Sequence, residues 1–137
     1  MNLRKINISN IIVVIVIIFF IFYVSISLFI GNSVKTNCIK AKKEYYGDCV
    51  TALIKLLNDE TKDFKSRNSA IWTLGQLGDQ RALFFLEKFY SGNIPSRESL
   101  GKSISQYELR KAINLIDEDF NISAIIWRNK IIGNFPQ

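Results

Sequence analysis

The feature that most constrains this chain is an uncharged run from Ile11 to Ile30, which reads IIVVIVIIFFIFYVSISLFI. A helix of about 20 apolar residues, rising about 1.5 Å per residue, spans the hydrocarbon core of a bilayer. A soluble β-strand would explain a shorter run of isoleucine and valine, but not one of this length. Ser25 and Ser27 are compatible with a membrane helix, because a serine hydroxyl can bond to a carbonyl of the preceding turn. The sequence therefore predicts one membrane-spanning helix.

A cleaved signal peptide is the alternative interpretation of this run. Arg4 and Lys5 would form its basic start, and Gly31 and Ser33 would form a weak cleavage site of small residues. The apolar stretch is longer than the usual signal-peptide core of about 7–15 residues. We therefore favour an uncleaved anchor.

Basic residues flank the anchor on both sides and bear on its orientation. The chain from Glu44 onward carries equal numbers of basic and acidic residues, so the net charge of +6 comes from the residues before it. Arg4 and Lys5 precede the anchor, and a short basic N-terminus normally stays in the cytoplasm, which predicts a C-terminal domain outside it. The cytoplasmic side, or secretion after cleavage, are the alternatives. Membrane lipid is an expected partner, because basic residues suit anionic head groups. The lysines that follow the anchor, and that argue for the cytoplasmic side, are Lys35, Lys40, Lys42 and Lys43.

The rest of the chain has the periodicity of a small all-α domain. We assign residues 1–33 to the N-terminal tail and anchor, 34–46 to a basic juxtamembrane segment and 47–137 to the helical domain. Apolar side chains recur in four segments at the i, i+3, i+4, i+7 spacing of an amphipathic helix. These stripes are Val50, Leu53, Ile54 and Leu57; Ala70, Ile71, Leu74 and Leu77; Ala82, Leu83, Leu86 and Phe89; and Leu109, Ala112, Ile113 and Ile116.

Breakers and caps separate the predicted helices. Gly47-Asp48 precedes the first helix, and Gly78-Asp79 is placed to end the second and cap the third. A loop at 91–103 separates the third helix from the fourth. The tail from Asn121 is predicted to be a last helix, or an extended segment, that covers the core.

A repeat motif runs through the second helix and the corner that follows it. Residues 67–83 follow the pattern R-x-x-A-x-x-x-L-G-x-L-G-D-x-R-A-L, and the spacings of residues 52–56 and 70–74 recur at 82–86 and 112–116. The motif resembles a HEAT repeat of the short type also found in phycobilisome lyases. The resemblance implies a small HEAT-like α-solenoid of about two helix pairs that binds proteins, with the anchor-side helix and the tail as caps. The motif residues are Arg67, Ala70, Leu74, Gly75, Leu77, Gly78, Asp79, Arg81, Ala82 and Leu83.

The composition argues against most catalytic chemistry. The absence of histidine removes the commonest general base and zinc ligand, and with it the serine–histidine and cysteine–histidine nucleophile systems. The stretch 101–103, Gly-Lys-Ser, resembles the end of a phosphate loop, but Ser96 replaces the required glycine and no strand precedes it. The balanced charge after the anchor argues against a nucleic-acid-binding face. We therefore predict no catalytic residue, cofactor, metal, nucleotide or nucleic acid.

The two cysteines, Cys38 and Cys49, can form one disulfide or remain reduced. A helix through both would hold them more than roughly 10 Å apart, whereas a bridge needs Cα atoms within about 7 Å. A disulfide therefore requires the chain to fold back between them, for which Gly47 is a candidate. A domain outside the cytoplasm would favour the bridge.

Two tryptophans are candidates for contact with a partner. Trp72 lies beside an apolar stripe, where core-edge packing and an interface anchor are the alternatives. Trp127 precedes Arg128 and Lys130, a pattern typical of the membrane interface. We hypothesise a membrane-anchored interaction module or scaffold without catalytic activity, with an unknown protein as partner. The alternatives are an accessory or lyase-like protein acting on a cofactor- or pigment-bearing partner, and a structural protein whose anchor carries the function.

Overall fold

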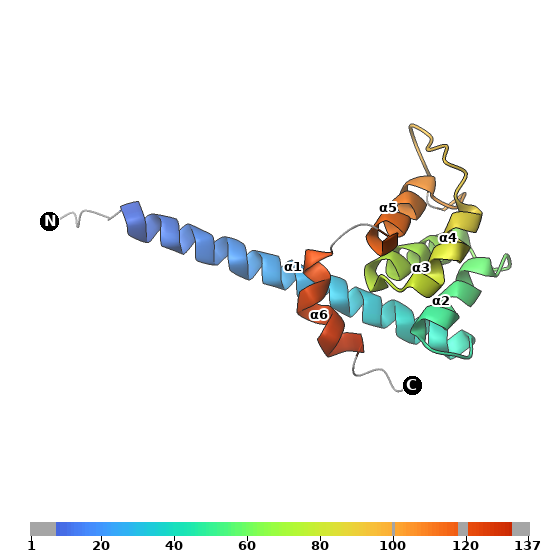
Figure 1. Ribbon diagram of the computed structural model, residues 1–137, viewed down its shortest axis with the longest axis horizontal. Coiled ribbons are helices and arrows are strands. Elements are labelled where there is room, and N and C mark those ends of the chain that lie inside the picture. The colour runs from blue at the N-terminus through green and yellow to red at the C-terminus, as the bar shows by residue number, and fades with distance from the viewer. Residues whose placement is uncertain (1–7, 100, 118–120, 133–137) are drawn as a thin grey trace, which may run out of the picture.

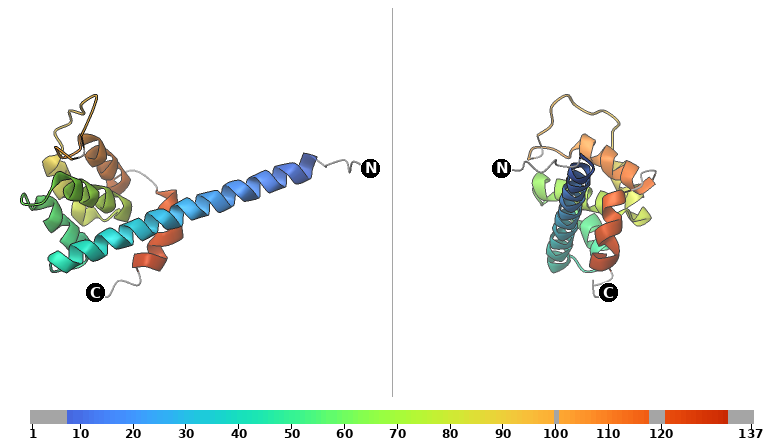
Figure 2. Two further views of the ribbon diagram at one scale, coloured as in Figure 1. Left: turned by 180° about the vertical axis from the view of Figure 1, so that it is seen from behind. Right: turned by 90° about the vertical axis from the view of Figure 1, so that its left-hand side faces the viewer.

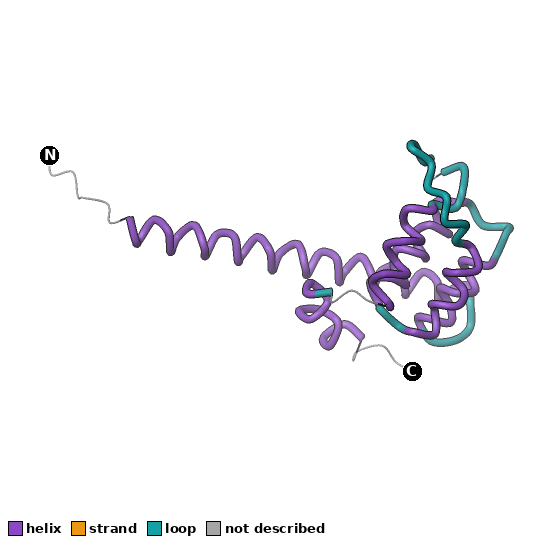
Figure 3. The backbone as a smooth tube through the Cα atoms, turned by 45° about the horizontal axis from the view of Figure 1, so that its top comes forward, coloured by secondary structure: helices purple, strands orange, loops and turns teal. Residues whose placement is uncertain are grey.

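Helices and loops make up all of the chain that the structure describes (Figure 1, Figure 3). The computed structural model describes residues 8–99, 101–117 and 121–132, and no strand occurs among them. The predicted all-α class is therefore confirmed, whereas Arg4 and Lys5 lie outside the described residues. The elements are α1 (Ile8–Glu44), α2 (Cys49–Asn58), α3 (Phe64–Leu77), the 3-10 helix η1 (Gln80–Ala82), α4 (Leu83–Phe89), α5 (Gln106–Asp117) and α6 (Ile122–Ile132).

The N-terminal half of α1 projects from the other helices as an exposed rod (Figure 1, Figure 2). Most of its large apolar side chains are exposed, and it is long and apolar enough to cross a membrane. The hydroxyls of Ser25 and Ser27 donate to the carbonyls of Ile21 and Tyr23 over 2.8 and 2.9 Å, as serines in a membrane helix are expected to do. A signal sequence near the N-terminus can pass the same test of length and hydropathy, so this feature alone does not distinguish the two.

The C-terminal half of α1 belongs to the packed body. The helix continues without a break through the segment that we assigned to a basic juxtamembrane region and ends at Glu44. One face buries five small residues, spaced alternately by four and three positions, which keeps them on one side of the helix. Small side chains let neighbouring helices approach closely, so this part of α1 contributes directly to the core. The five residues are Ser27, Gly31, Val34, Cys38 and Ala41.

The chain reverses direction between α1 and α2. Gly47 adopts a positive φ of 132°, which side chains other than glycine rarely tolerate, and α2 begins two residues later. The reversal brings the Cα atoms of Cys38 and Cys49 to 5.1 Å, and the two residues form a disulfide. The carboxylate of Asp48 accepts the N–H of Thr51 over 2.9 Å, so the predicted N-cap of α2 is confirmed.

The core lies where α3 packs between α2 and α5, with α4 against α5. The four predicted apolar stripes fall on these helices, except that Ala82 lies on η1, and they contribute buried or half-buried side chains. The closest approach is at Gly75, where an added methyl group would lie 2.7 Å from the Cα of Ala112. The absence of a side chain at Gly75 therefore allows α3 and α5 to meet backbone to backbone.

A tight corner joins α3 to α4. Gly78 ends α3 in the left-handed conformation, as predicted, with φ 64° and ψ 30°. Asp79 caps η1 rather than α4 itself, because its carboxylate accepts the N–H of Arg81 over 2.9 Å and α4 begins only at Leu83. The guanidinium of Arg81 binds the carboxylates of Asp79 and Asp48, at 2.8 and 2.7 Å, and so ties this corner to the start of α2.

This ion-pair network predicts a loss of stability in acid. Burial alone would raise the pKa of Asp48, but hydrogen bonds from Thr51 and Arg81 outweigh it and lower the pKa from 3.8 to about 2. Hydrogen bonding by Arg81 lowers the pKa of Asp79 as well. Because both folded-state pKa values lie below the unfolded ones, the stabilisation is complete above the unfolded pKa near 4 and is lost as the pH falls towards 2. Denaturant unfolding of the solubilised protein between pH 7 and pH 2 should show this decline, and Arg81→Gln should make it shallower.

The contribution of Asp79 as an N-cap can be separated experimentally from the contribution of its charge. Asp79→Ala should lower the free energy of unfolding at neutral pH by about 0.5–2 kcal/mol. Asp79→Asn should lower it less, because the amide oxygen can still accept the Arg81 N–H. Equal losses from the two substitutions would assign the effect of Asp79 to its charge, and a pH profile unchanged by Arg81→Gln would contradict the network.

The predicted tail is the helix α6, which crosses α1 and is joined to α3 (Figure 2). Arg128 donates to the carbonyl of Gln76 over 2.8 Å, and Asn121 donates to the side-chain oxygen of Gln76 over 3.1 Å. Trp127, a candidate for contact with a partner or with the membrane interface, is fully buried in this structure, so its indole presents no surface for such a contact. Its neighbours Arg128 and Lys130 suggested an interface, but the indole faces inward on α6.

Trp72 is half-buried against the core, which agrees with core-edge packing.

Candidate functional site

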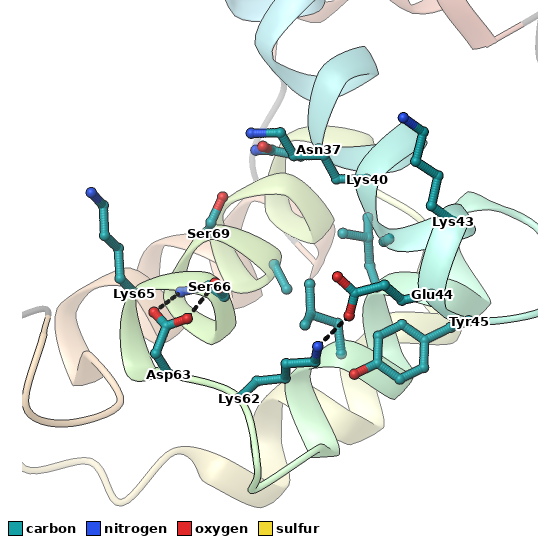
Figure 4. Close-up of a pocket in the computed structure, with 14 residues that line it drawn as sticks. Asn37, Lys40, Lys43, Glu44, Tyr45, Lys62, Asp63, Lys65, Ser66 and Ser69 are labelled. Atoms are coloured by element: carbon teal, nitrogen blue, oxygen red, sulfur yellow. Dashed lines mark hydrogen bonds and ion pairs between the residues drawn. The ribbon is translucent and has the colours of Figure 1, made fainter.

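A cleft of about 610 Å³ opens between the last turns of α1 and the first turns of α3 (Figure 4). Its lining comes from residues 37–45, residues 62–70 and the buried side of α2. The reversal at Gly47 and the disulfide after it fix α2 against α1, and α3 then returns alongside both. The cleft is therefore made by segments that are separate in the sequence.

The base of the cleft is apolar. Ala41 of α1, Leu53 of α2 and Ala70 of α3 are buried there, and Leu56 is half-buried beside them. These side chains belong to the main core, so the base is rigid. An aliphatic part of a ligand could pack against it.

Two acidic groups at the cleft are already satisfied within the protein. Glu44 forms an ion pair with Lys62, and this contact raises the pKa of the Lys62 ammonium. Asp63 is the N-cap of α3 and accepts the hydroxyl and the N–H of Ser66 over 2.7 and 2.9 Å, which lowers its pKa. Neither carboxylate is left to neutralise the other lysines.

Three exposed lysines line the cleft without a partner. Lys40 and Lys43 lie on α1 and Lys65 on α3, and within the described ranges none of their ammonium groups has a hydrogen bond or an ion pair. The charged residues of the lining are four lysines and two carboxylates, which gives a net charge of +2. The cleft therefore attracts anions.

A hydrogen-bonded rim fixes one end of the cleft. The Tyr45 hydroxyl donates to the carboxylate of Asp59 over 2.5 Å, and Asp59 also accepts the hydroxyl and the N–H of Thr61 over 2.6 and 2.9 Å. Hydrogen bonds from Thr61 and then from Tyr45 lower the pKa of Asp59 to about 2. Burial, followed by the contact with Asp59, raises the pKa of Tyr45 to about 12. The end of α1 is thereby tied to the turn between α2 and α3.

The opposite end is held by a buried threonine. The side-chain amide of Asn37 donates to the hydroxyl of Thr73 over 2.9 Å, and that hydroxyl donates to the carbonyl of Ser69 over 2.7 Å. Thr73 is fully buried, so the contact pins α1 to α3 where solvent does not compete. Both walls of the cleft are thus fixed before any ligand binds.

This arrangement is suited to binding an acidic ligand. Ammonium groups bind carboxylates and phosphates by charge-assisted hydrogen bonds, and the apolar base can hold a neighbouring aliphatic group. No cluster of three or more His, Cys, Asp or Glu side chains that could hold a metal is found over the described residues.

The repeat motif of the sequence contributes little to this cleft, since Ala70 is its only member in the lining. Arg67 is buried, donates to the carbonyl of Leu57 over 2.9 Å, and has its guanidinium over the rings of Phe64 and Phe89 at 5.9 and 5.6 Å. The motif therefore shapes the interior of α3 and the corner after it.

Sequence reasoning did not find the cleft. It assigned Lys40 and Lys43 to lipid head groups and did not single out Lys62 or Lys65. The available signal was the chain reversal required by a Cys38–Cys49 disulfide, because it folds the lysines of α1 towards the following helices.

Comparison with known proteins gives no match: no family model fits the chain, and neither a curated protein nor a solved structure is similar to it.

Proposed function

We propose that this chain is a non-catalytic, membrane-anchored module that binds an acidic segment of a protein partner in the cleft between α1 and α3. The observation that carries the proposal is the set of three unpartnered lysines, Lys40, Lys43 and Lys65, around an apolar base. An extended or helical segment that carries both carboxylates and leucine-like side chains matches this lining. The exposed half of α1 serves as the anchor.

The position of the cleft along α1 favours a protein partner over a lipid head group. If the span ends near Ile30, then Lys40 and Lys43 lie about 15 and 20 Å beyond it, at a rise of about 1.5 Å per residue. The head-group region extends only about 5–8 Å beyond the hydrocarbon core. The cleft therefore opens in water above the membrane surface.

The helical body is proposed to be a short HEAT-like repeat pair. Two packing features support this: α2 lies against α3 and α4 against α5, and α3 lies against α5. The close approach at Gly75 and the corner at Gly78 give physical reasons for the glycines of the motif. The second half of α1 packs on α2 and α3, and α6 packs on α1 and touches α3, so both lie beside the repeat pair, as caps would.

The body is proposed to lie outside the cytoplasm. The disulfide between Cys38 and Cys49 supports this orientation, since such bonds persist in oxidising compartments. Thiol labelling of the protein in native membranes should require reductant and denaturant. Full labelling of both cysteines by denaturant alone would contradict the orientation.

A charge-reversal pair tests the cleft. The triple variant Lys40→Glu, Lys43→Glu, Lys65→Glu should bind a fluorescent peptide of alternating glutamate and leucine at least roughly tenfold more weakly than the unmodified protein, a loss of about 1.4 kcal/mol. The matched control reverses three exposed basic residues outside the cleft, Lys88, Arg97 and Lys102, and changes the net charge by the same amount.

Binding would be measured by fluorescence anisotropy on the solubilised full chain, with circular dichroism to verify that both variants fold. Equal weakening in the two triple variants would indicate general charge attraction and would overturn the proposed site. Equally strong binding of a lysine–leucine peptide by the unmodified protein would also overturn the proposed site.

A further inference from the structure

The helix α6 crosses α1 at the end of its apolar run (Figure 1, Figure 2). α2 and α3 meet α1 around Cys38 and Asn37, through the disulfide and the hydrogen bond to Thr73. α6 contacts α1 and crosses it on the N-terminal side of these points (Figure 1), and the buried residues of α1 on that side include Ser27 and Gly31. α6 thus covers α1 at the boundary between its exposed and its packed halves.

The length of the span places this crossing at the membrane surface. A span that begins at Ile11 and rises about 1.5 Å per residue covers the roughly 30 Å hydrocarbon core by about Ile30. Gly31 then lies at the edge of the core, and Ser27 lies about 5 Å inside it. Any element packed on Ser27 and Gly31 shares that depth. α6 also crosses α1 obliquely rather than running along it (Figure 2).

The outward side of α6 has the composition that this depth requires. Ile122 and Ile125 are 60% and 56% exposed, whereas Ala124 and Trp127 are buried on the inward side. Phe29 of α1 is 73% exposed at the same level, and the exposed Lys35 follows about one turn beyond Gly31, at head-group height. Exposed apolar side chains therefore occur on α6 as well as on the adjoining part of α1.

We infer that α6 is an interfacial helix, whose exposed isoleucines lie among the lipid head groups and the first part of the acyl chains. Together with α1 it gives the protein a second contact with the bilayer, and its bonds to Gln76 of α3 transmit that contact to the body. Apolar area and nearby positive charge are the two terms that hold such helices at a membrane surface. The inference rests on the proposed span of α1.

Three single cysteines at similarly exposed positions test it. Phe20→Cys marks the middle of the span, Ile125→Cys marks α6, and Phe84→Cys marks the body; the native side chains are 65%, 56% and 69% exposed. The native disulfide leaves only the new thiol to react with an environment-sensitive NBD fluorophore. The labelled full chains would be reconstituted in vesicles of phosphatidylcholine and phosphatidylglycerol, with and without a lipid spin-labelled near the glycerol backbone.

We expect the fluorophore at 125 to emit at shorter wavelength than at 84 and to be quenched by the spin-labelled lipid at least roughly twofold more strongly, as an interfacial position requires. Blue-shifted emission at 20 with neither a blue shift nor quenching at 125 would overturn the inference and leave the span intact, whereas emission at 20 at as long a wavelength as at 84 would remove the span itself. A blue shift at 125 without quenching by lipid would mean that protein, such as a second copy of this chain, covers α6, and would also overturn it.

Discussion

Trp127→Ala should lower the free energy of unfolding by about 3–5 kcal/mol, the cost usually found for removing a buried tryptophan side chain. Trp127 is the largest fully buried side chain among the described residues, and the other buried residue described in α6 is the small Ala124. The substitution should therefore release α6 first. Hydrogen exchange would show this as a loss of protection in α6 before the rest of the body unfolds.

Trp127→Phe provides the matched comparison. The indole N–H is buried and has no hydrogen-bond partner among the described residues, so phenylalanine loses no bond and removes an unsatisfied donor. Its cost should be clearly smaller than that of alanine. A cost below about 0.5 kcal/mol for Trp127→Ala, the range of surface substitutions, would contradict the packing of α6 on α1.

Leu74→Ala should cost about 2–5 kcal/mol, because the side chain is fully buried in the last turn of α3 and its loss leaves a cavity between packed helices. The neighbouring Gly75 meets the backbone of Ala112, which limits how far α5 can move to fill the space. Chemical unfolding of the solubilised protein, followed by circular dichroism, would measure the change.

Leu83→Ala is the control for this prediction, since Leu83 belongs to the same repeat motif but is only half-buried. It should cost less than Leu74→Ala. Equal costs at the two positions would show that burial does not set the stability of α3, and would remove Leu74 from its central place in the core.

The helices after Gly47 could be predicted because their cores are made of large apolar side chains at helical spacing. The end of α3 at Gly78 and the N-cap of α2 at Asp48 could also be predicted, since each depends on one residue type at one position. The corner after α3 was predicted less fully, because the choice between a 3-10 turn and an immediate helix depends on how Arg81 bridges two carboxylates.

The second half of α1 could not be predicted in the same way. Its buried face is built from small residues such as Gly31 and Ala41, which carry little hydropathy signal, while its lysines dominate the composition. Trp127 was assigned from its neighbours, and these do not reveal which side of α6 the indole occupies. The cleft depends on where separate helices meet, which local spacing does not encode.

The unbroken course of α1 from the exposed rod to Glu44 makes the rod and one wall of the cleft parts of a single continuous helix. A flexible linker would let the body turn freely relative to the rod, but a helix without proline or an internal break transmits tilt and rotation along its length. The angle at which the N-terminal half sits therefore sets the direction in which Lys40 and Lys43 point. A neighbouring helix that changed the tilt of the rod would therefore change the direction in which the cleft opens, without contacting the cleft.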